Sequence, residues 1–101
     1  MDSFNALVEP NRRRLLEAIR RTPCTVNTLV GELGLSQPAV SKHLKVLKEA
    51  GLVVVRPEGQ KRWYELNAEP LLEIEHFLEP YRIFFNKKLD ALELHLDEMD
   101  Q

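Results

Sequence analysis

The sequence predicts a mainly helical fold with one small β-hairpin. Apolar residues recur at helical spacing along most of the chain. Proline, serine or threonine precedes several of these stretches and glycine follows two of them, as at the starts and ends of helices. A single β-rich stretch is divided by turn residues. The chain has 101 residues, enough for one small domain, and we expect residues 1–101 to form that domain.

The first clear amphipathic helix is expected from Pro10 to about Arg21. Proline suits the first helical position, because an N–H group there would have no partner within the helix. Pro23 prevents the helix from continuing much further. The apolar face of this helix consists of Leu15, Leu16 and Ile19.

Two short helices are expected next, at about residues 25–50. Thr25 and Ser36 are residue types that cap helix N-termini, and Gly34 and Gly51 are suited to end helices with left-handed backbone. Two short helices joined by a tight turn that contains glycine form a helix-turn-helix. The apolar stripes are Val26, Leu29, Val30 and Leu33 in the first helix, and Val40, Leu44 and Leu47 in the second.

The β-rich stretch predicts a hairpin with strands at Leu52–Arg56 and Lys61–Leu66. The four residues between them, 57–60, have turn chemistry, including a glycine that is free to take positive φ. A hairpin directly after a helix-turn-helix is a wing, so the predicted class is a winged helix-turn-helix with its wing at about residues 52–66. Tyr64 is expected to pack against the core, and Trp63 to support the wing or touch a sugar.

The chain from about residue 69 to 99 is expected to be helical, with Pro80 either starting a new helix or kinking a continuing one. Its apolar residues recur at three- and four-residue intervals, as in helices that pair. We expect the same helix of a second chain to cover them, helped by a short helix at about residues 3–8. In the alternative, the stripe folds back on its own domain, as we expect Phe84 or Tyr81 to do. The residues assigned to the dimer interface are Phe4, Leu7, Leu78, Phe85, Leu89, Leu92, Leu96 and Met99.

Charge is unevenly distributed, although the formal net charge is only −2. Residues 36–62 carry six lysines and arginines against two acidic residues, whereas residues 63–101 carry three against ten. A basic centre in an acidic chain suggests a local face that binds a polyanion. The alternative is a solvated charged surface without a partner.

The polar side of the second helix of the helix-turn-helix is the candidate DNA-reading surface. At 100° per residue, the side opposite its apolar stripe is polar and basic. Gln37 and Ser41 can bond to base edges or phosphates, while the lysines neutralise phosphates. We therefore assign the helix Ser36–Ala50 to the major groove and wing residues 56–62 to the DNA backbone. In the alternative, the serine is only a cap and the lysines are only solvated. The assigned DNA-contacting residues are Gln37, Pro38, Ser41, Lys42, Lys45, Arg56, Gln60, Lys61 and Arg62.

Three segments together resemble the winged-helix repressors of the ArsR/SmtB family. The central segment, Ser36–Leu66, reads SQPAVSKHLKVLKEAGLVVVRPEGQKRWYEL. Leu7–Ile19 reads LVEPNRRRLLEAI and is similar to the second helix of that family. Tyr81–Met99 reads YRIFFNKKLDALELHLDEM and is similar to the long terminal dimerisation helix of one branch. One departure is Gln60, which stands where many relatives have an arginine.

The resemblance implies a homodimeric transcriptional regulator that binds specific DNA sequences and represses by occluding a promoter. The implied partner is double-stranded DNA with a near-palindromic operator, read by two recognition helices in successive major grooves. The contrasting hypothesis is a winged-helix module for protein interaction, whose DNA affinity is incidental. Neither the residues nor the resemblance indicates a small-molecule inducer.

Many members of this family sense metals, so a metal site is expected here only if the ligand residues are present at the family's positions. The resemblance places the family's thiolate pair at Thr25 and Asn27, and neither residue is cysteine. The histidine site of the terminal helix lacks its expected partners, and His95 with Glu98 could bind a metal only weakly across a dimer. We therefore expect no metal site and no cofactor. A metal-responsive repressor with a non-standard site remains the alternative.

Other functional classes find little support in the sequence. No phosphate-binding loop, nucleophile elbow or zinc-hydrolase pair is present, so we expect no enzyme. The single cysteine, Cys24, cannot form an internal disulfide, fits a reducing cytoplasm and is expected to be a packed thiol. No apolar run approaches the ~18 residues of a membrane span and no secretory signal is evident, so we expect no membrane partner. His43, beside the apolar stripe, is expected to pack or to make a buried hydrogen bond.

Overall fold

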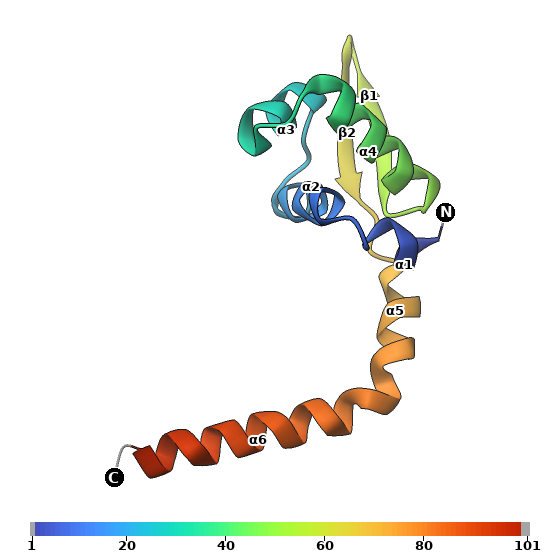
Figure 1. The fold of residues 1–101 in the computed structure, drawn as a ribbon. Coiled ribbons are helices and arrows are strands. Elements are labelled where there is room, and N and C mark those ends of the chain that lie inside the picture. The colour runs from blue at the N-terminus through green and yellow to red at the C-terminus, as the bar shows by residue number, and fades with distance from the viewer. Residues whose placement is uncertain (1, 100–101) are drawn as a thin grey trace.

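The computed structural model describes the backbone of residues 2–99 and the side chains of residues 2–93 (Figure 1). It is mainly helical with one two-stranded antiparallel sheet, which confirms the predicted fold class. A short 3-10 helix, η1, separates the last two α-helices. The elements in chain order are α1 (Ser3–Ala6), α2 (Pro10–Arg21), α3 (Val26–Leu33), α4 (Gln37–Glu49), β1 (Val53–Glu58), β2 (Lys61–Leu66), α5 (Leu71–Leu78), η1 (Glu79–Tyr81) and α6 (Arg82–Met99).

The helix-turn-helix of α3 and α4 has the caps that the sequence predicts. The Ser36 hydroxyl accepts a hydrogen bond from the Ala39 N–H at 3.2 Å, and Thr25 caps α3 in the same way. Gly34 ends α3 with a φ of 67°, a left-handed conformation that favours glycine. The turn between the two helices is therefore fixed by local chemistry at both ends.

The core lies among α2, α3, α4 and the start of β1. The predicted stripes of α2 and α4 point into it, and each helix buries one face while the other stays polar. Tyr64 packs on this core from β2, as expected, and pairs with the backbone of Cys24. The largest fully buried side chains are Leu15, Ile19, Leu29, Leu44, Leu47, Leu52, Val40, Val53 and Cys24.

The hairpin is longer than the sequence predicted. Pro57 pairs with Arg62 and Glu58 pairs with Lys61, so only two residues form the turn, and the expectation of a four-residue turn at 57–60 was wrong. Gly59 makes the tight turn possible with a φ of 61°. Proline is tolerated in β1 because each strand of a two-stranded sheet has only one neighbour.

Helices α5 and α6 leave the winged helix-turn-helix as an arm (Figure 1). Pro80 lies in η1, so the break between them is one 3-10 turn. The molecule measures 60 × 29 × 21 Å. Phe84 and Tyr81 are 65% and 46% exposed, so the expectation that they fold back on their own domain was wrong. The reason is geometric, because α5 leads the chain away from the winged helix-turn-helix and α6 then runs apart from its core (Figure 1).

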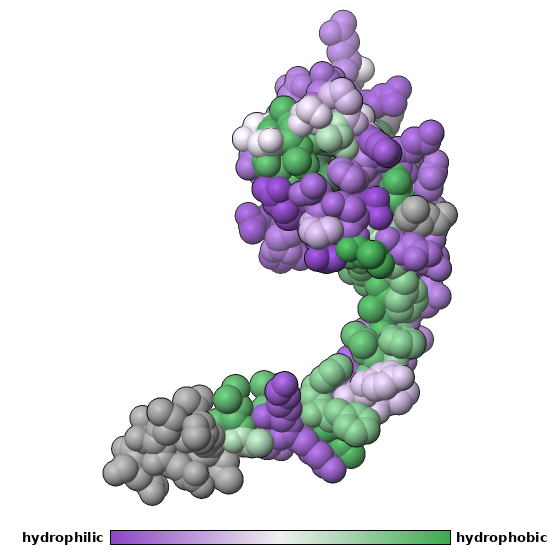
Figure 2. Space-filling model, in the orientation of Figure 1, coloured by the Kyte–Doolittle hydropathy of each residue, from purple (hydrophilic) through white to green (hydrophobic). Residues whose placement is uncertain are grey.

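The arm exposes many large apolar side chains, which we call the terminal apolar surface, and hydrophilic side chains interrupt it along α6 (Figure 2). So many large apolar side chains exposed close together are unusual on a monomeric soluble protein. No helix in the described part of the chain is both long enough and apolar enough to cross a bilayer. The surface comprises Leu72, Phe77, Leu78, Tyr81, Ile83, Phe84, Phe85, Leu89 and Leu92.

Candidate nucleic-acid interface

The outward face of α4 presents every residue that the sequence assigned to DNA on this helix. All five are exposed, whereas the apolar stripe of α4 is buried against α2, α3 and β1. Over about two turns the helix therefore offers polar and cationic groups together, with a single proline as the non-polar side chain among them. The five residues are Gln37, Pro38, Ser41, Lys42 and Lys45.

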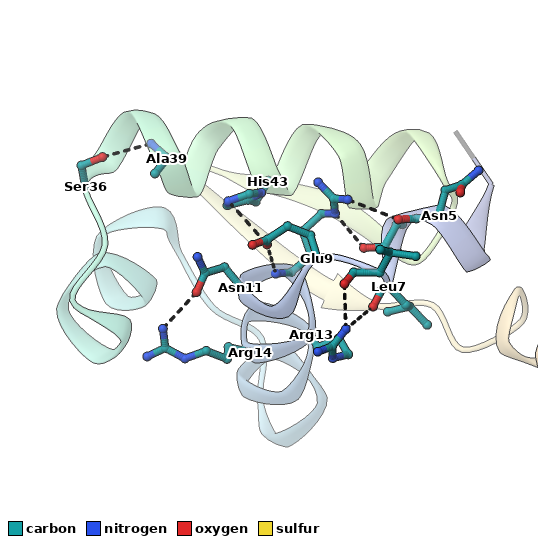
Figure 3. Close-up of polar contacts among 12 residues, drawn as sticks. Asn5, Leu7, Glu9, Asn11, Arg13, Arg14, Ser36, Ala39 and His43 are labelled. Atoms are coloured by element: carbon teal, nitrogen blue, oxygen red, sulfur yellow. Dashed lines mark hydrogen bonds and ion pairs between the residues drawn. The ribbon is translucent and has the colours of Figure 1, made fainter.

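His43 points inward from α4 toward the start of α2 (Figure 3). Its Nε2 lies 3.7 Å from a carboxylate oxygen of Glu9, and its side chain is 17% exposed. The same Glu9 oxygen accepts a hydrogen bond from the Arg12 N–H at 3.0 Å and so caps α2. The position agrees with the expected packing role of His43, because its ring faces α2 and is mostly covered.

The arginines at the start of α2 hold the short helix α1 in place. Arg12 donates hydrogen bonds from its guanidinium to the backbone oxygens of Ala6 at 2.6 Å and Asn5 at 3.2 Å. Arg13 donates to those of Leu7 at 2.6 Å and of the next residue at 3.0 Å (Figure 3). These carbonyls lie at the end of a four-residue helix, which would not be stable alone. Two guanidinium groups thus satisfy the helix end.

Removing this contact is expected to destabilise the fold. Arg12→Ala should lower the free energy of unfolding by about 1–3 kcal/mol, because charged hydrogen bonds to two carbonyls are lost. Arg21→Ala is the control, since Arg21 is exposed and makes only a 3.7 Å ion pair with Glu17; we expect a change within about 0.5 kcal/mol. Urea denaturation followed by circular dichroism measures both, and equal values for the two variants would contradict the role of Arg12.

The cations of the wing differ in whether acidic side chains pair with them. Arg56 is held between Glu58 at 3.0 Å and Glu65 at 2.8 Å, and hydrogen bonding to Glu65 first, then to Glu58, raises its pKa. Its charge is thereby offset by two carboxylates. Lys61 instead lies 5.9 Å from the centre of the Trp63 ring, a cation–π contact that orients its ammonium group. Arg56 is therefore already paired with carboxylates, whereas Lys61 at the tip of the wing contacts an aromatic ring instead.

The tip of the wing meets the starts of α3 and α4 at a cleft of about 280 Å³. Four residues assigned to DNA, Gln37, Gln60, Lys61 and Arg62, come together there. The sequence did not assign the other three residues to DNA: it predicted Thr25 as a helix cap and Val26 as part of an apolar stripe, and it placed Thr25 and Asn27 where the family has metal ligands. We call this feature the α3–wing cleft; its lining residues are Thr25, Val26, Asn27, Gln37, Gln60, Lys61 and Arg62.

Cys24 lies just before α3 but is turned into the core. It is 2% exposed, and its Sγ–H donates to the backbone oxygen of Thr22 at 3.2 Å. Burial first, and then the negative charge of Glu32, raise the pKa of the thiol. Both effects favour the protonated form over the reactive thiolate.

The thiol is accordingly expected to react slowly. In the folded protein near pH 8, we expect modification by a chromogenic disulfide reagent to be at least about tenfold slower than in the urea-unfolded chain. The folded rate should rise further with pH than that of an ordinary cysteine, because the folded pKa is higher. Equal folded and unfolded rates at one pH, after correction for urea, would show that Cys24 is accessible and ionised.

The described side chains, residues 2–93, contain no group of three or more histidine, cysteine, aspartate or glutamate residues that could hold a metal ion. His76 is exposed on α5, apart from Cys24 in the core. His95 and Glu98 lie outside the described side chains, as do Leu96 and Met99 of the assigned dimer interface. The absence of a metal site therefore stays a prediction.

Comparison with known proteins decides the family. The family model described as "Bacterial regulatory protein, arsR family" matches residues 9–55, from the cap of α2 into β1. The HTH-type transcriptional regulator Rv2034 of Mycobacterium tuberculosis is 39% identical over 78% of this chain and 74% of its own length. The chain belongs to the ArsR family. Within this family, residues 9–55 contain the whole helix-turn-helix and the face of α4 described above.

Two further ArsR-type comparisons agree in sequence and in structure. The transcriptional repressor SdpR of Bacillus subtilis is 31% identical over 67% of this chain and 76% of its own. The solved structure of the ArsR-like transcriptional regulator from Rhodococcus sp. RHA1 superposes with a TM-score of 0.70, at 27% identity over 88% of this chain and 84% of its own. These relatives are regulators rather than enzymes. The resemblance and the winged-helix fold predicted from the sequence are confirmed, and the chain is a transcriptional regulator of the ArsR family.

Proposed function

We propose that this regulator is a homodimeric repressor that binds a near-palindromic operator. The observation that carries the proposal is the outward face of α4, where exposed polar and cationic residues lie together on a helix whose other face is buried. Residues with this combination on one helix can enter the major groove and contact base edges and phosphates at once. The residues assigned to base edges are Gln37 and Ser41, and those assigned to phosphates are Lys42 and Lys45.

The terminal apolar surface supports the dimer. Phe85, Leu89 and Leu92 are 50–61% exposed along one stripe of α6, and all three carry large side chains. Phe4 of α1 continues this surface, because its ring meets Phe77 edge-on at 5.6 Å. A second copy of the same surface would remove these side chains from water, with each contact occurring twice by symmetry.

The dimer gives the mechanism its geometry. In this proposal residues 1–101 act as one unit, in which α1, α5 and α6 join two chains and present two α4 helices to successive major grooves, about 34–36 Å apart. The wings follow the flanking backbone. A dimer bound over a promoter excludes other proteins from the same DNA, which represses without any chemical step. The name of SdpR, a transcriptional repressor, supports the direction of regulation.

A gel-shift measurement tests the proposal. The full-length protein is incubated with the DNA upstream of its own gene and with an unrelated fragment of equal length, each at two salt concentrations. Retardation of the first fragment alone, weakening as salt rises, is expected of a sequence-specific regulator. Equal weak retardation of both fragments would reject the proposal in favour of a protein-interaction module. Release by zinc from an otherwise stable complex would favour a metal-responsive repressor instead.

A further inference from the structure

We propose that the α3–wing cleft seats one backbone phosphate of the bound DNA, and that Asn27, outside both α4 and the wing, is a DNA-contacting residue. The inference rests on the proposed DNA-binding function and adds a contact site to it. The cleft is built from three segments that are far apart in the chain, namely the start of α3, the first residue of α4 and the tip of the wing.

The chemistry of the lining matches a phosphodiester. Lys61 and Arg62 supply two positive charges, and Asn27 and Gln60 supply side-chain amides that can donate hydrogen bonds, while Gln37 stays assigned to a base edge. None of the seven lining residues is acidic. A phosphate offers one negative charge and oxygens that only accept, so it can be paired by every one of these donors. A cationic ligand would find no opposite charge in this cleft.

The two cations that line this cleft are also the wing cations that no described carboxylate pairs with. Arg56 forms ion pairs with two carboxylates, but within the described part of the chain neither Lys61 nor Arg62 has an acidic partner. The contact with the Trp63 ring holds the ammonium group of Lys61 against the wing and leaves its positive charge uncompensated. Lys61 and Arg62 both line the α3–wing cleft, so the unpaired cations at the tip of the wing border this cleft.

The position of the cleft favours DNA over a free anion. Gln37 belongs both to the cleft and to the face of α4 that is assigned to the major groove, so a strand lying along that face passes the cleft. Asn27, Gln37, Lys61 and Arg62 are all exposed. Solvated side chains of this kind hold a lone phosphate weakly, whereas DNA is held in register by many other contacts.

The decisive variant is Asn27→Asp, which adds a negative charge to the cleft of each protomer. Asn27 lies in the first turn of α3, where a carboxylate stabilises the helix, so a loss of binding is not a loss of folding. With the fragment retained in the gel shift, we expect affinity to fall at least about tenfold and the logarithmic salt slope to fall by about two, one contact for each protomer. Asn86→Asp, the same change on exposed α6, is the control and should match wild type.

A neutral phosphate analogue identifies the contact directly. DNA fragments carrying a single methylphosphonate, placed in turn along the site, should include one position that weakens wild type but leaves Asn27→Asp and Lys61→Ala unaffected. Equal losses for wild type and variants at every position would overturn the inference, as would an Asn27→Asp variant that matches Asn86→Asp. Wild type that binds no DNA selectively would overturn the proposed function, and this inference with it.

A titration with inorganic phosphate separates the two sources of the anion. The full chain is titrated at constant ionic strength while the amide NMR signals of Asn27 and Lys61 are followed. We expect no saturable shift below about 1 mM phosphate. Saturation below that concentration would overturn the assignment to DNA and make the cleft a site for a free anion.

Discussion

Phe85→Glu combined with Leu92→Glu should convert the protein into a folded monomer that binds its operator at least about 100-fold more weakly. Both side chains belong to the stripe of α6 assigned to the dimer, and they are 50% and 56% exposed in the single chain. Their replacement cannot disturb a core to which neither side chain belongs. In the dimer, however, four unpaired carboxylates would have to enter an apolar interface, and burying even one such charge costs several kcal/mol.

The loss of DNA affinity follows from the loss of the dimer. Two winged helices joined in one molecule engage the second half-site at a high effective concentration, which raises the affinity of the pair by about 10²–10⁴ over one alone. Sedimentation equilibrium gives the association state and fluorescence anisotropy gives the operator affinity. The single variants Phe85→Glu and Asn86→Glu form a matched pair, because they add the same charge at neighbouring positions of α6. A dimeric double variant, or equal effects of the two single variants, would reject this interface.

The helix boundaries of the winged helix could be predicted because local chemistry determines them. Ser36 and Thr25 cap helices through their own hydroxyls, and Gly34 ends α3 with its left-handed backbone. The turn of the hairpin was predicted two residues too long, because proline occurs both in turns and in edge strands, and the sequence around Pro57 fits either. Only pairing across the hairpin, which joins Pro57 to Arg62, distinguishes the two.

The outward face of α4 was predictable from helical periodicity, since the direction of each side chain follows from its position in the sequence. The α3–wing cleft was not, because it brings Asn27 beside Lys61, and no local pattern joins residues so far apart. The role of Arg12 was missed for a similar reason. Its guanidinium folds back onto carbonyls at the end of α1, and no local sequence pattern indicates that contact.

The apolar stripe of α6 was readable in the sequence, but its surroundings were not. Periodicity shows which side chains share a face and does not show what covers that face. Phe84 and Tyr81 illustrate the difference, because both were expected on their own domain and both are exposed. The path of α5, which leads the chain away from the core before α6 begins, decides this outcome (Figure 1).

Two pairs of substitutions on and beside α4 should separate sequence recognition from general DNA affinity. Gln37→Ala and Ser41→Ala are expected to lower the preference for the operator over unrelated DNA by about 1–3 kcal/mol each, because a contact with a base edge discriminates by that amount. Lys42→Ala and Arg62→Ala are expected to weaken binding to both DNAs alike, because a phosphate is the same in every sequence. All four side chains are exposed, so none of these changes should alter the fold.

The salt dependence distinguishes the two classes independently of the operator sequence. Each phosphate contact releases counterions, so loss of Lys42 from both protomers should reduce the logarithmic salt slope by about two. Gln37→Ala and Ser41→Ala carry no charge change and should leave the slope near that of wild type. Anisotropy titrations of all four variants on the operator and on unrelated DNA, at several salt concentrations, provide both quantities. Wild-type affinity, preference and slope in every variant, with helical content unchanged, would show that α4 does not read DNA.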